Sequence, residues 1–222
     1  MKRFAMPGLV GLLVVAVVAV GTFFGVKQYR AEASAKQLCQ QFTEQVAALP
    51  DPAGEGPTVL GDSYTAGFGL QDPSHGYAFA LHPGAIDAFP GSGFVDESPC
   101  GAQSFARRLL ELPAGGELLI IQGGLNDSDE KGVEAAAIEA LHIAKMKASK
   151  VVLVGPPTVP AKTPEELAAV DTAYANAAAN VGVKYVPALG WKLEVSGDGL
   201  HLTEAGHRQF AARLAPLVGA SL

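Results

Sequence analysis

The stretch TVLGDSYTAGFGL, residues 58–70, decides how this chain folds. It begins with a short β-prone run, residues 58–60, that leads directly into Gly61, Asp62 and Ser63. A strand that ends in a sharp turn before a helix presents one side chain at the carboxyl edge of a sheet. Helix N–H groups at that edge stabilise negative charge. Ser63 is therefore either a nucleophile or an ordinary helix N-cap. For a serine at such a turn, the N-cap role is the more common of the two.

Outward from this stretch, strand-like runs alternate with helical segments. Apolar runs typical of buried strands lie at 117–121 and 151–154, and shorter strands are expected at 93–95 and 183–186. Residues 76–90 have no clean period, so a short helix and a loop are expected there. Helices are predicted at the remaining segments, which are 101–112, 133–147, 163–180 and 203–218.

The third of these helices has a clear start signal. Thr163 is expected as its N-cap, Pro164 as its first residue and Glu166 as the partner in a capping box. Alternating strands and helices imply right-handed βαβ crossovers. The fold class predicted is α/β, three-layered, with a flavodoxin-like parallel sheet of about five strands and helices on both faces.

The amino terminus has a different composition. Residues 8–26, GLVGLLVVAVVAVGTFFGV, carry no charge and are long enough to cross a membrane as a helix. Signal peptides have shorter apolar regions of about 7–15 residues. The small residues at 31–35 offer a cleavage site, but Lys27 and Arg30 separate it from the apolar run. An uncleaved transmembrane anchor is expected, with the globular domain outside the cytoplasm, and a cleaved, secreted form is the alternative.

Three regions are expected on this basis. They are an anchor or signal at 1–30, a juxtamembrane helix with its linker at 31–56, and a globular domain at 57–222. The juxtamembrane segment has apolar residues at helical spacing, namely Leu38, Phe42, Val46 and Leu49. The breaker-rich residues 50–57 mark the entry to the domain.

Composition excludes several classes of function. The net charge is −6, which argues against a sequence-independent grip on nucleic acid phosphates. The two cysteines, Cys39 and Cys100, are too few and too far apart for a zinc site. No metal cluster or cofactor fingerprint is visible in the sequence. Four histidines have no partner at ligand spacing and are expected at the surface: His75, His82, His142 and His207.

Four loops, all expected at one edge of the sheet, contain residues able to perform chemistry. They are Gly61–Ser63, Cys100–Ala102, Gly123–Asp127 and Asp198–His201. Each alone has a common structural explanation, such as a tight turn, a helix cap or a surface histidine. Together they supply a nucleophile, an amide donor, an acid and a base.

In order and content these loops resemble the sequence blocks of the SGNH (GDSL-type) esterases and lipases, and the resemblance covers about residues 57–218. It implies that Ser63 attacks an acyl carbonyl, that His201 transfers the proton, and that Asp198 holds the imidazole. It also implies an oxyanion hole formed by the Ser63 and Gly101 backbone N–H groups and the Asn126 side chain. The glycine block fits loosely, since Gly91 or Gly93 can also occupy it, but the helix after Gly101 favours that position.

The expected function is therefore hydrolysis of carboxylic esters of short acyl chains, or of carbohydrate or cell-envelope esters, without metal or cofactor. Two alternatives remain open within this fold: acyl transfer to a sugar or cell-wall acceptor, and a non-catalytic envelope-binding module. A flavodoxin-like phosphate binder shares the architecture but gives no reason for Asp198 and His201. Cys39 and Cys100 either form a disulfide, which suits an exported protein, or remain two buried thiols.

Overall fold

The computed structural model of the protein describes residue 28 and residues 30–128 and 131–219. The anchor predicted at 8–26 lies outside these residues. Within the described part, no helix is long and apolar enough to cross a membrane.

A single sheet forms the centre of the domain. Its five strands are all parallel and lie in the order β2-β1-β3-β4-β5. Their bounds are Thr58–Gly61 (β1), Ala85–Ala88 (β2), Gly116–Gln122 (β3), Ala148–Val154 (β4) and Lys184–Val186 (β5). This confirms the predicted α/β class and the flavodoxin-like strand order. In this order, successive strands are added toward one side of β1 first and then, from β3 onward, toward the other side.

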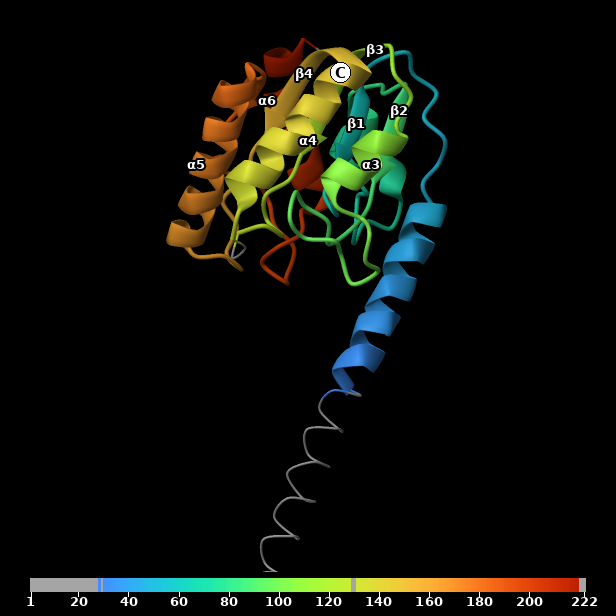
Figure 1. The fold of residues 1–222 in the computed structure, drawn as a ribbon. Coiled ribbons are helices and arrows are strands. Elements are labelled where there is room, and N and C mark those ends of the chain that lie inside the picture. Colours follow the sequence, from blue (N-terminus) through green and yellow to red (C-terminus); the bar gives the residue numbers. More distant parts are fainter. Residues whose placement is uncertain (1–27, 29, 129–130, 220–222) are drawn as a thin grey trace, which may run out of the picture.

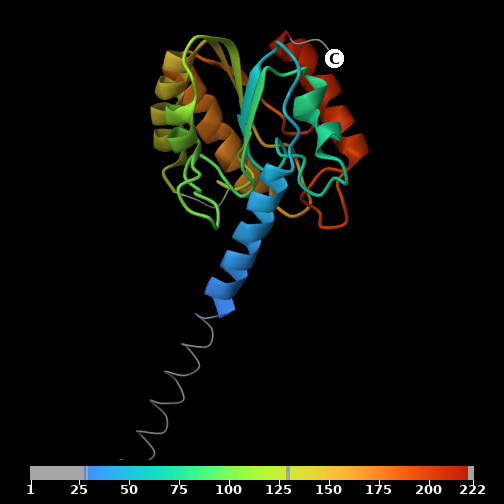
Figure 2. The ribbon, with the colours of Figure 1, turned by 90° about the vertical axis from the view of Figure 1, so that its right-hand side faces the viewer.

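Helices cover both faces of the sheet (Figures 1 and 2). On one face lie α3 (Phe105–Glu111), α4 (Val133–Lys147) and α5 (Pro164–Val181). The other face packs against α2 (Tyr77–Ala80), which follows the short 3-10 helix η1 (Pro73–His75), and against α6 (Glu204–Val218). Successive β3 residues supply the two cores in turn: Ile120 faces α6, and Ile121 faces α4.

One strand was predicted at the wrong place. Residues 93–95 form a loop, and the amides of Phe94 and Val95 donate to the Asp127 carboxylate instead of to a neighbouring strand. The strand is β2, at the edge of the sheet, where one side lacks a strand partner. Its four residues AIDA are mostly half-buried and have no apolar alternation, so their pattern did not indicate a strand.

The amino-terminal helix, residues 30–47, stands apart from these layers. It approaches the domain with its carboxyl end, and its amino end projects past the sheet edge at which the strands terminate (Figures 1 and 2). The linker that follows returns along the domain to β1, and the amides of Gly54 and Gly56 donate to the carbonyls of Pro83 and His82.

The predicted capping box of α5 is confirmed. The Thr163 hydroxyl accepts from the Glu166 N–H at 3.2 Å, and the Glu166 carboxylate accepts from the Thr163 N–H at 2.7 Å. Pro164 follows at the first helical position. Two of the N–H groups that a helix start leaves unpaired are thereby satisfied.

We expect Thr163→Ala to lower the free energy of unfolding by about 1 kcal/mol, because the N-cap acceptor is lost. The matched control is Thr172→Ala, in the exposed middle of the same helix, where the hydroxyl only bonds the Ala168 carbonyl. Urea denaturation of both variants measures the difference. Equal losses in the two variants would show that the cap contributes nothing special.

Candidate active site

The turn that carries the predicted nucleophile, residues 62–69, begins where β1 ends and is called the nucleophile turn below. A Cβ at Gly61 would lie 2.0 Å from Thr65 Oγ1, so only glycine fits at this position. Ser63 follows at the carboxyl edge of the sheet and is 9% exposed. Its carbonyl accepts from the Phe68 N–H at 2.9 Å, and its hydroxyl has no hydrogen-bond partner among the described residues. The hydroxyl is therefore free to meet a substrate.

The loop ahead of α6 holds an acid–base pair. His201 Nδ1 lies 2.7 Å from Asp198 Oδ2. The other carboxylate oxygen accepts from the Ser196 hydroxyl at 2.7 Å and from the Leu200 and His201 amides at 2.9 and 3.0 Å. Although partial burial works the other way, these hydrogen bonds hold the pKa of Asp198 well below its ordinary value. Asp198 is thus an anion that pairs with the imidazole at Nδ1, and Nε2 has no hydrogen-bond partner among the described residues.

Two contacts bring the nucleophile turn and the histidine loop together. The Tyr64 hydroxyl donates to the Leu200 carbonyl at 2.6 Å, and the Phe68 and His201 ring centroids are 4.9 Å apart. Burial raises the pKa of Tyr64, with the Asp62 and Asp198 charges adding to the effect, so the phenol remains a donor. No hydrogen bond joins Ser63 to His201 in the described structure, and catalytic bonds often tighten only when substrate binds.

The loop after β3 meets the loop after β2. The Asn126 side chain donates to the Ser92 carbonyl at 2.8 Å, which places its amide beside the turn at residues 91–93. The Gly101 amide, by contrast, donates to the Ser98 carbonyl at 2.9 Å and is committed to its own turn. The Gly91 amide has no acceptor among the described residues, which makes this turn, and not Gly101, the better source of a backbone donor.

Asp127 fixes the shape of this neighbourhood. Its carboxylate accepts from the three amides of residues 94–96 at 2.7–3.1 Å and from the Tyr174 hydroxyl at 2.8 Å. A Cβ at Gly93 would lie 2.3 Å from Asp127 Oδ1, so the loop can approach this closely only at glycine. Asp127 therefore orients this loop.

Asp62, between Gly61 and Ser63, is fully buried. Its Oδ1 accepts from the Tyr64 N–H at 2.9 Å, while Oδ2 has no partner among the described residues. Burial raises the pKa of Asp62 to about 7; the Tyr64 amide and Arg108 oppose this shift, and the Asp127 charge adds to it. The Gln122 side chain can donate to Asp62 Oδ1 at 3.2 Å when its amide also accepts from the Gly123 N–H.

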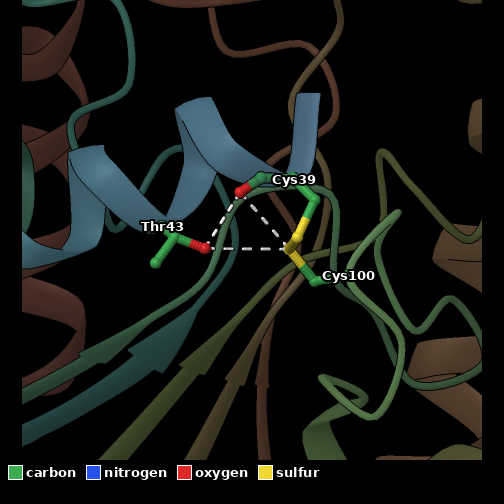
Figure 3. Close-up of a disulfide and its surroundings, with 3 residues drawn as sticks. All are labelled: Cys39, Thr43 and Cys100. Carbon is green, nitrogen blue, oxygen red and sulfur yellow. Dashed lines mark hydrogen bonds between the residues drawn. A yellow bond between two sulfur atoms is a disulfide. The ribbon is translucent and has the colours of Figure 1, made fainter. Parts of the chain in front are cut away.

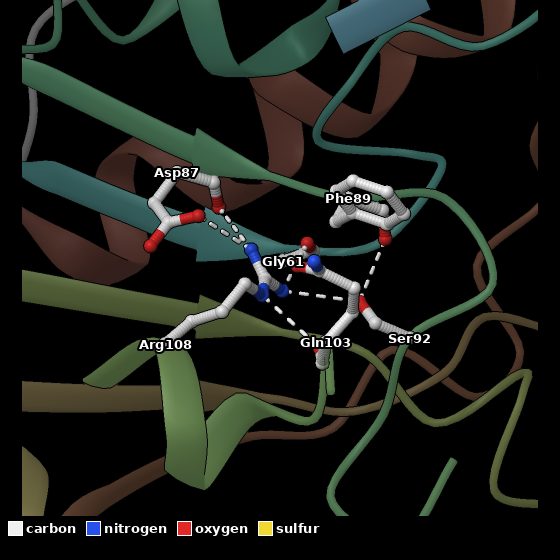
Figure 4. Close-up of polar contacts among 6 residues, drawn as sticks. All are labelled: Gly61, Asp87, Phe89, Ser92, Gln103 and Arg108. Atoms are coloured by element: carbon white, nitrogen blue, oxygen red, sulfur yellow. Dashed lines mark hydrogen bonds and ion pairs between the residues drawn. The ribbon is translucent and has the colours of Figure 1, made fainter. Parts of the chain in front are cut away.

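One buried guanidinium ties these loops to the sheet (Figure 4). Arg108 of α3 donates to the Gly61 carbonyl at 2.8 Å, to Ser92 Oγ at 3.0 Å and to the Gln103 carbonyl at 3.2 Å. It also bonds the Asp87 carbonyl at 3.0 Å and the Asp87 carboxylate at 2.6 Å. All five N–H groups of the guanidinium are thereby used. No sequence pattern predicts this role, since Arg108 lies in the segment FARRLLE beside a second arginine, Arg107.

Two further residue predictions can be compared with the structure. His207, expected at the surface, is 1% exposed, so that expectation was wrong. Its Nδ1 accepts from the Tyr77 N–H at 3.3 Å and its ring stacks on Tyr77. Burial lowers the pKa of His207 to about 4, with the nearby His201 adding to the effect, so it packs as a neutral residue.

The structure joins Cys39 and Cys100 in a disulfide (Figure 3). The bridge links the amino-terminal helix to the loop that precedes α3. No group of three or more metal-ligating side chains lies close enough together to hold a metal within the described ranges.

Comparison with known proteins agrees with this geometry. Residues 59–209 match the sequence profile described as the GDSL-like Lipase/Acylhydrolase family. A search of curated proteins gave no match.

Solved structures with the same fold include three at 18–22% identity. A putative arylesterase from Agrobacterium tumefaciens str. C58 is 22% identical, with a TM-score of 0.59 over 74% of this chain and 98% of that one. Est24, a carbohydrate acetylesterase from Sinorhizobium meliloti, is 18% identical, with a TM-score of 0.57 over 74% and 99%. The M. smegmatis aryl esterase is 19% identical, with a TM-score of 0.56 over 74% and 98%. At these identities the similarity establishes the fold.

We expect Arg108→Lys to lower the free energy of unfolding by about 2–4 kcal/mol, because a lysine cannot reproduce the guanidinium fork and leaves buried acceptors unpaired. Arg107→Lys is the matched control, since Arg107 is the exposed neighbour on the same helix and should change stability by less than about 0.5 kcal/mol. Urea denaturation measures both. Similar values for the two variants would contradict the role of Arg108.

The buried Asp62 predicts a pH dependence of stability. Because its folded pKa of about 7 lies above the ordinary 3.8, the folded state holds the proton more tightly than the unfolded state. The stability that this proton contributes is complete below about pH 4 and is lost as the pH rises through about 7. Asp62→Asn cannot ionise and should flatten this decline, which melting temperatures measured between pH 4 and 8 would show.

The control for that experiment is Asp72→Asn. Asp72 is exposed, and its pKa is lowered by hydrogen bonds from Ser74, so its contribution has the opposite sign and is lost as the pH falls. If the wild type and Asp62→Asn give parallel melting curves against pH, the proton is not on Asp62.

Proposed function

The chain belongs to the GDSL-like lipase/acylhydrolase family, and from this premise we propose that it is a serine esterase that cleaves carboxylic esters through an acyl-enzyme at Ser63. The observation that carries the proposal is the pairing of His201 with Asp198 in a loop that Tyr64 ties to the nucleophile turn. The imidazole and its carboxylate partner then lie at the same sheet edge as a serine hydroxyl that has no hydrogen-bond partner among the described residues. A phosphate-binding or purely structural domain gives no reason for this arrangement.

In the proposed mechanism, Ser63 Oγ attacks the acyl carbon while His201 Nε2 takes the hydroxyl proton. The tetrahedral intermediate collapses, the bond to the alcohol oxygen breaks, and His201 returns the proton to the leaving alkoxide. Water then attacks the acyl-enzyme with the same imidazole as base, releasing the carboxylic acid and restoring Ser63. Asp198 keeps its negative charge throughout and stabilises the imidazolium that forms in each half.

The developing oxyanion needs donors that are already in place. We assign this role to the Asn126 side-chain amide and the Ser63 N–H, together with an amide of the Gly91–Ser92 turn in place of the Gly101 amide. The turn follows β2 and lies directly beside Asn126, whereas Gly101 sits farther along the chain in a turn of its own. Removing one such donor typically costs about 2.7–4 kcal/mol of transition-state stabilisation.

For the substrate we propose an ester with a short acyl chain, carried by a carbohydrate or another component of the cell envelope. Two structures with this fold, Est24 and the Geobacillus protein Axe2, are described as a carbohydrate acetylesterase and an acetyl-xylooligosaccharide esterase. In this chain the half-buried Phe68 ring already occupies space against His201. That packing favours a small acyl group over a long one.

We propose further that the apolar run at 8–26 anchors the enzyme in a membrane, with the catalytic domain outside the cytoplasm. The Cys39–Cys100 disulfide supports a compartment outside the cytoplasm. The described amino-terminal helix projects past the sheet edge at which the strands terminate (Figure 2). An anchor that continues from its amino end would turn the catalytic edge toward the membrane surface. Esters near that surface would then be the accessible ones.

The test uses the full-length chain, purified under oxidising conditions, with p-nitrophenyl acetate, butyrate and octanoate. We expect Ser63→Ala and His201→Ala to reduce kcat by about 10⁴-fold or more, and Asn126→Ala by about 10²–10³-fold. His142→Ala, an exposed histidine on α4, is the control and should leave the rate unchanged. Acetate should be the best of the three substrates.

Equal ester release by wild type and Ser63→Ala would overturn the nucleophile assignment and favour a non-catalytic envelope-binding module. Product analysis with an added sugar acceptor separates hydrolysis from acyl transfer, since a transferase would form the sugar ester in place of the free acid.

A further inference from the structure

The amino-terminal helix brings a buried aromatic ring to the catalytic edge. Phe42 is 8% exposed, and its ring meets that of Phe68 edge-to-face, with centroids 5.4 Å apart and planes at 87°. The Phe68 ring in turn lies 4.9 Å from the His201 imidazole. Three rings from three distant parts of the sequence thus form one row that ends on the proposed general base.

Phe68 lies in a turn between two glycines and is held by contacts from inside the turn and from outside it. Gly67 and Gly69 flank it with φ angles of +61° and +88°, a region that glycine enters without cost. Inside the segment, the Phe68 N–H bonds the Ser63 carbonyl at 2.9 Å. From outside, the amino-terminal helix supplies two contacts: the Phe42 ring and the Gln45 side chain, which reaches the Ala66 carbonyl at 3.5 Å.

The amino-terminal helix is attached to the domain by a disulfide as well as by a few side-chain contacts. Along residues 30–47 most side chains are exposed, so the helix gains little stability from packing against the domain. The disulfide between Cys39 and Cys100 lies about one turn before Phe42 and fixes the helix against the loop ahead of α3 (Figure 3). Phe42 also packs over Gly91, where a Cβ would come within 3.0 Å of its ring, so the helix covers the turn beside Asn126.

We propose that Phe42 is a positioning residue for the esterase reaction. Through Phe68 it sets the position of the His201 imidazole, and the Cys39–Cys100 disulfide makes the amino-terminal helix a lasting part of the active site. The proposal rests on the esterase function proposed above. It goes beyond that function because it assigns a catalytic contribution to a segment outside the domain that matches the family, residues 59–209.

The experiment compares variants of the full-length chain at equal concentrations of competent serine, determined by titration with a fluorophosphonate. We expect Phe42→Ala to lower kcat for p-nitrophenyl acetate about 10-fold or more with little change in KM, because a misplaced base slows the chemical steps more than binding. Phe42→Leu, which restores apolar volume, should recover most of the rate. Leu38→Ala is the matched control, since Leu38 lies one turn earlier on the same helix and is 37% exposed.

The contribution of the disulfide is tested by the double variant Cys39→Ser/Cys100→Ser. Its kcat should fall about as far as that of Phe42→Ala, and adding Phe42→Ala to it should cause little further loss, since both changes remove the same support. Fully additive losses, or a Phe42→Ala variant with wild-type kcat per competent serine, would overturn the proposal. Because kcat is expressed per titrated serine, a loss of folded protein alone does not change it. A fall in kcat therefore reports on positioning of the reacting groups and not on the amount of folded protein.

A second measurement does not depend on turnover. The Phe68 ring should shift the NMR signals of the His201 ring protons, and in Phe42→Ala these signals should move toward solvent-exposed values while Leu38→Ala leaves them in place. Unchanged signals in Phe42→Ala would overturn the proposal even if the wild type showed no Ser63-dependent turnover. A wild type without Ser63-dependent turnover would refute the esterase function instead. The NMR comparison would then still test the contact of Phe42 and Phe68 with His201.

Discussion

The structure of the catalytic edge depends on the Arg108 guanidinium. Parallel strands end with carbonyls that no further strand residue can pair, and the loops that follow must be held by other donors. Arg108 supplies five N–H groups at this point: it joins the ends of β1 and β2 through Gly61 and Asp87, and it continues into the next loop through Ser92. Because Asn126 donates to the Ser92 carbonyl, the proposed oxyanion donor depends on the same network.

Negative charge is concentrated around this cation. Asp87 pairs with it directly, while Arg108 and Asp127 act in opposite directions on the pKa of the buried Asp62. Asp127 accepts hydrogen bonds from three amides and from the Tyr174 hydroxyl. Asp62 has a single backbone donor for one oxygen, and burial raises its pKa to about 7. The raised pKa of Asp62 thus follows mainly from its burial, which a single amide donor and the Arg108 charge only partly offset.

Sequence patterns predicted those features that local chemistry determines. The buried strands at 117–121 and 151–154 and the cap of α5 at Thr163 are set by residues adjacent in the chain, and all were confirmed. The edge strand β2 was missed because a strand exposed on one side needs little apolar alternation. His207 was misplaced for a related reason: its burial comes from packing against Tyr77, which lies 130 residues away in sequence.

The site shows the same division. Ser63, Asn126, Asp198 and His201 stand out in sequence because their motifs are contiguous, and the structure brings their loops to one edge. Backbone hydrogen bonds within loops cannot be predicted from the sequence. The Gly101 amide donates to the Ser98 carbonyl, and this contact is seen only in the folded structure. The contact of Phe42 with Phe68 is equally hidden, since an apolar residue on a helical stripe predicts burial without saying against what. The Cys39–Cys100 disulfide restricts where the apolar stripe of this helix can pack, and so gives it a defined position against Phe68, the neighbour of the proposed general base His201.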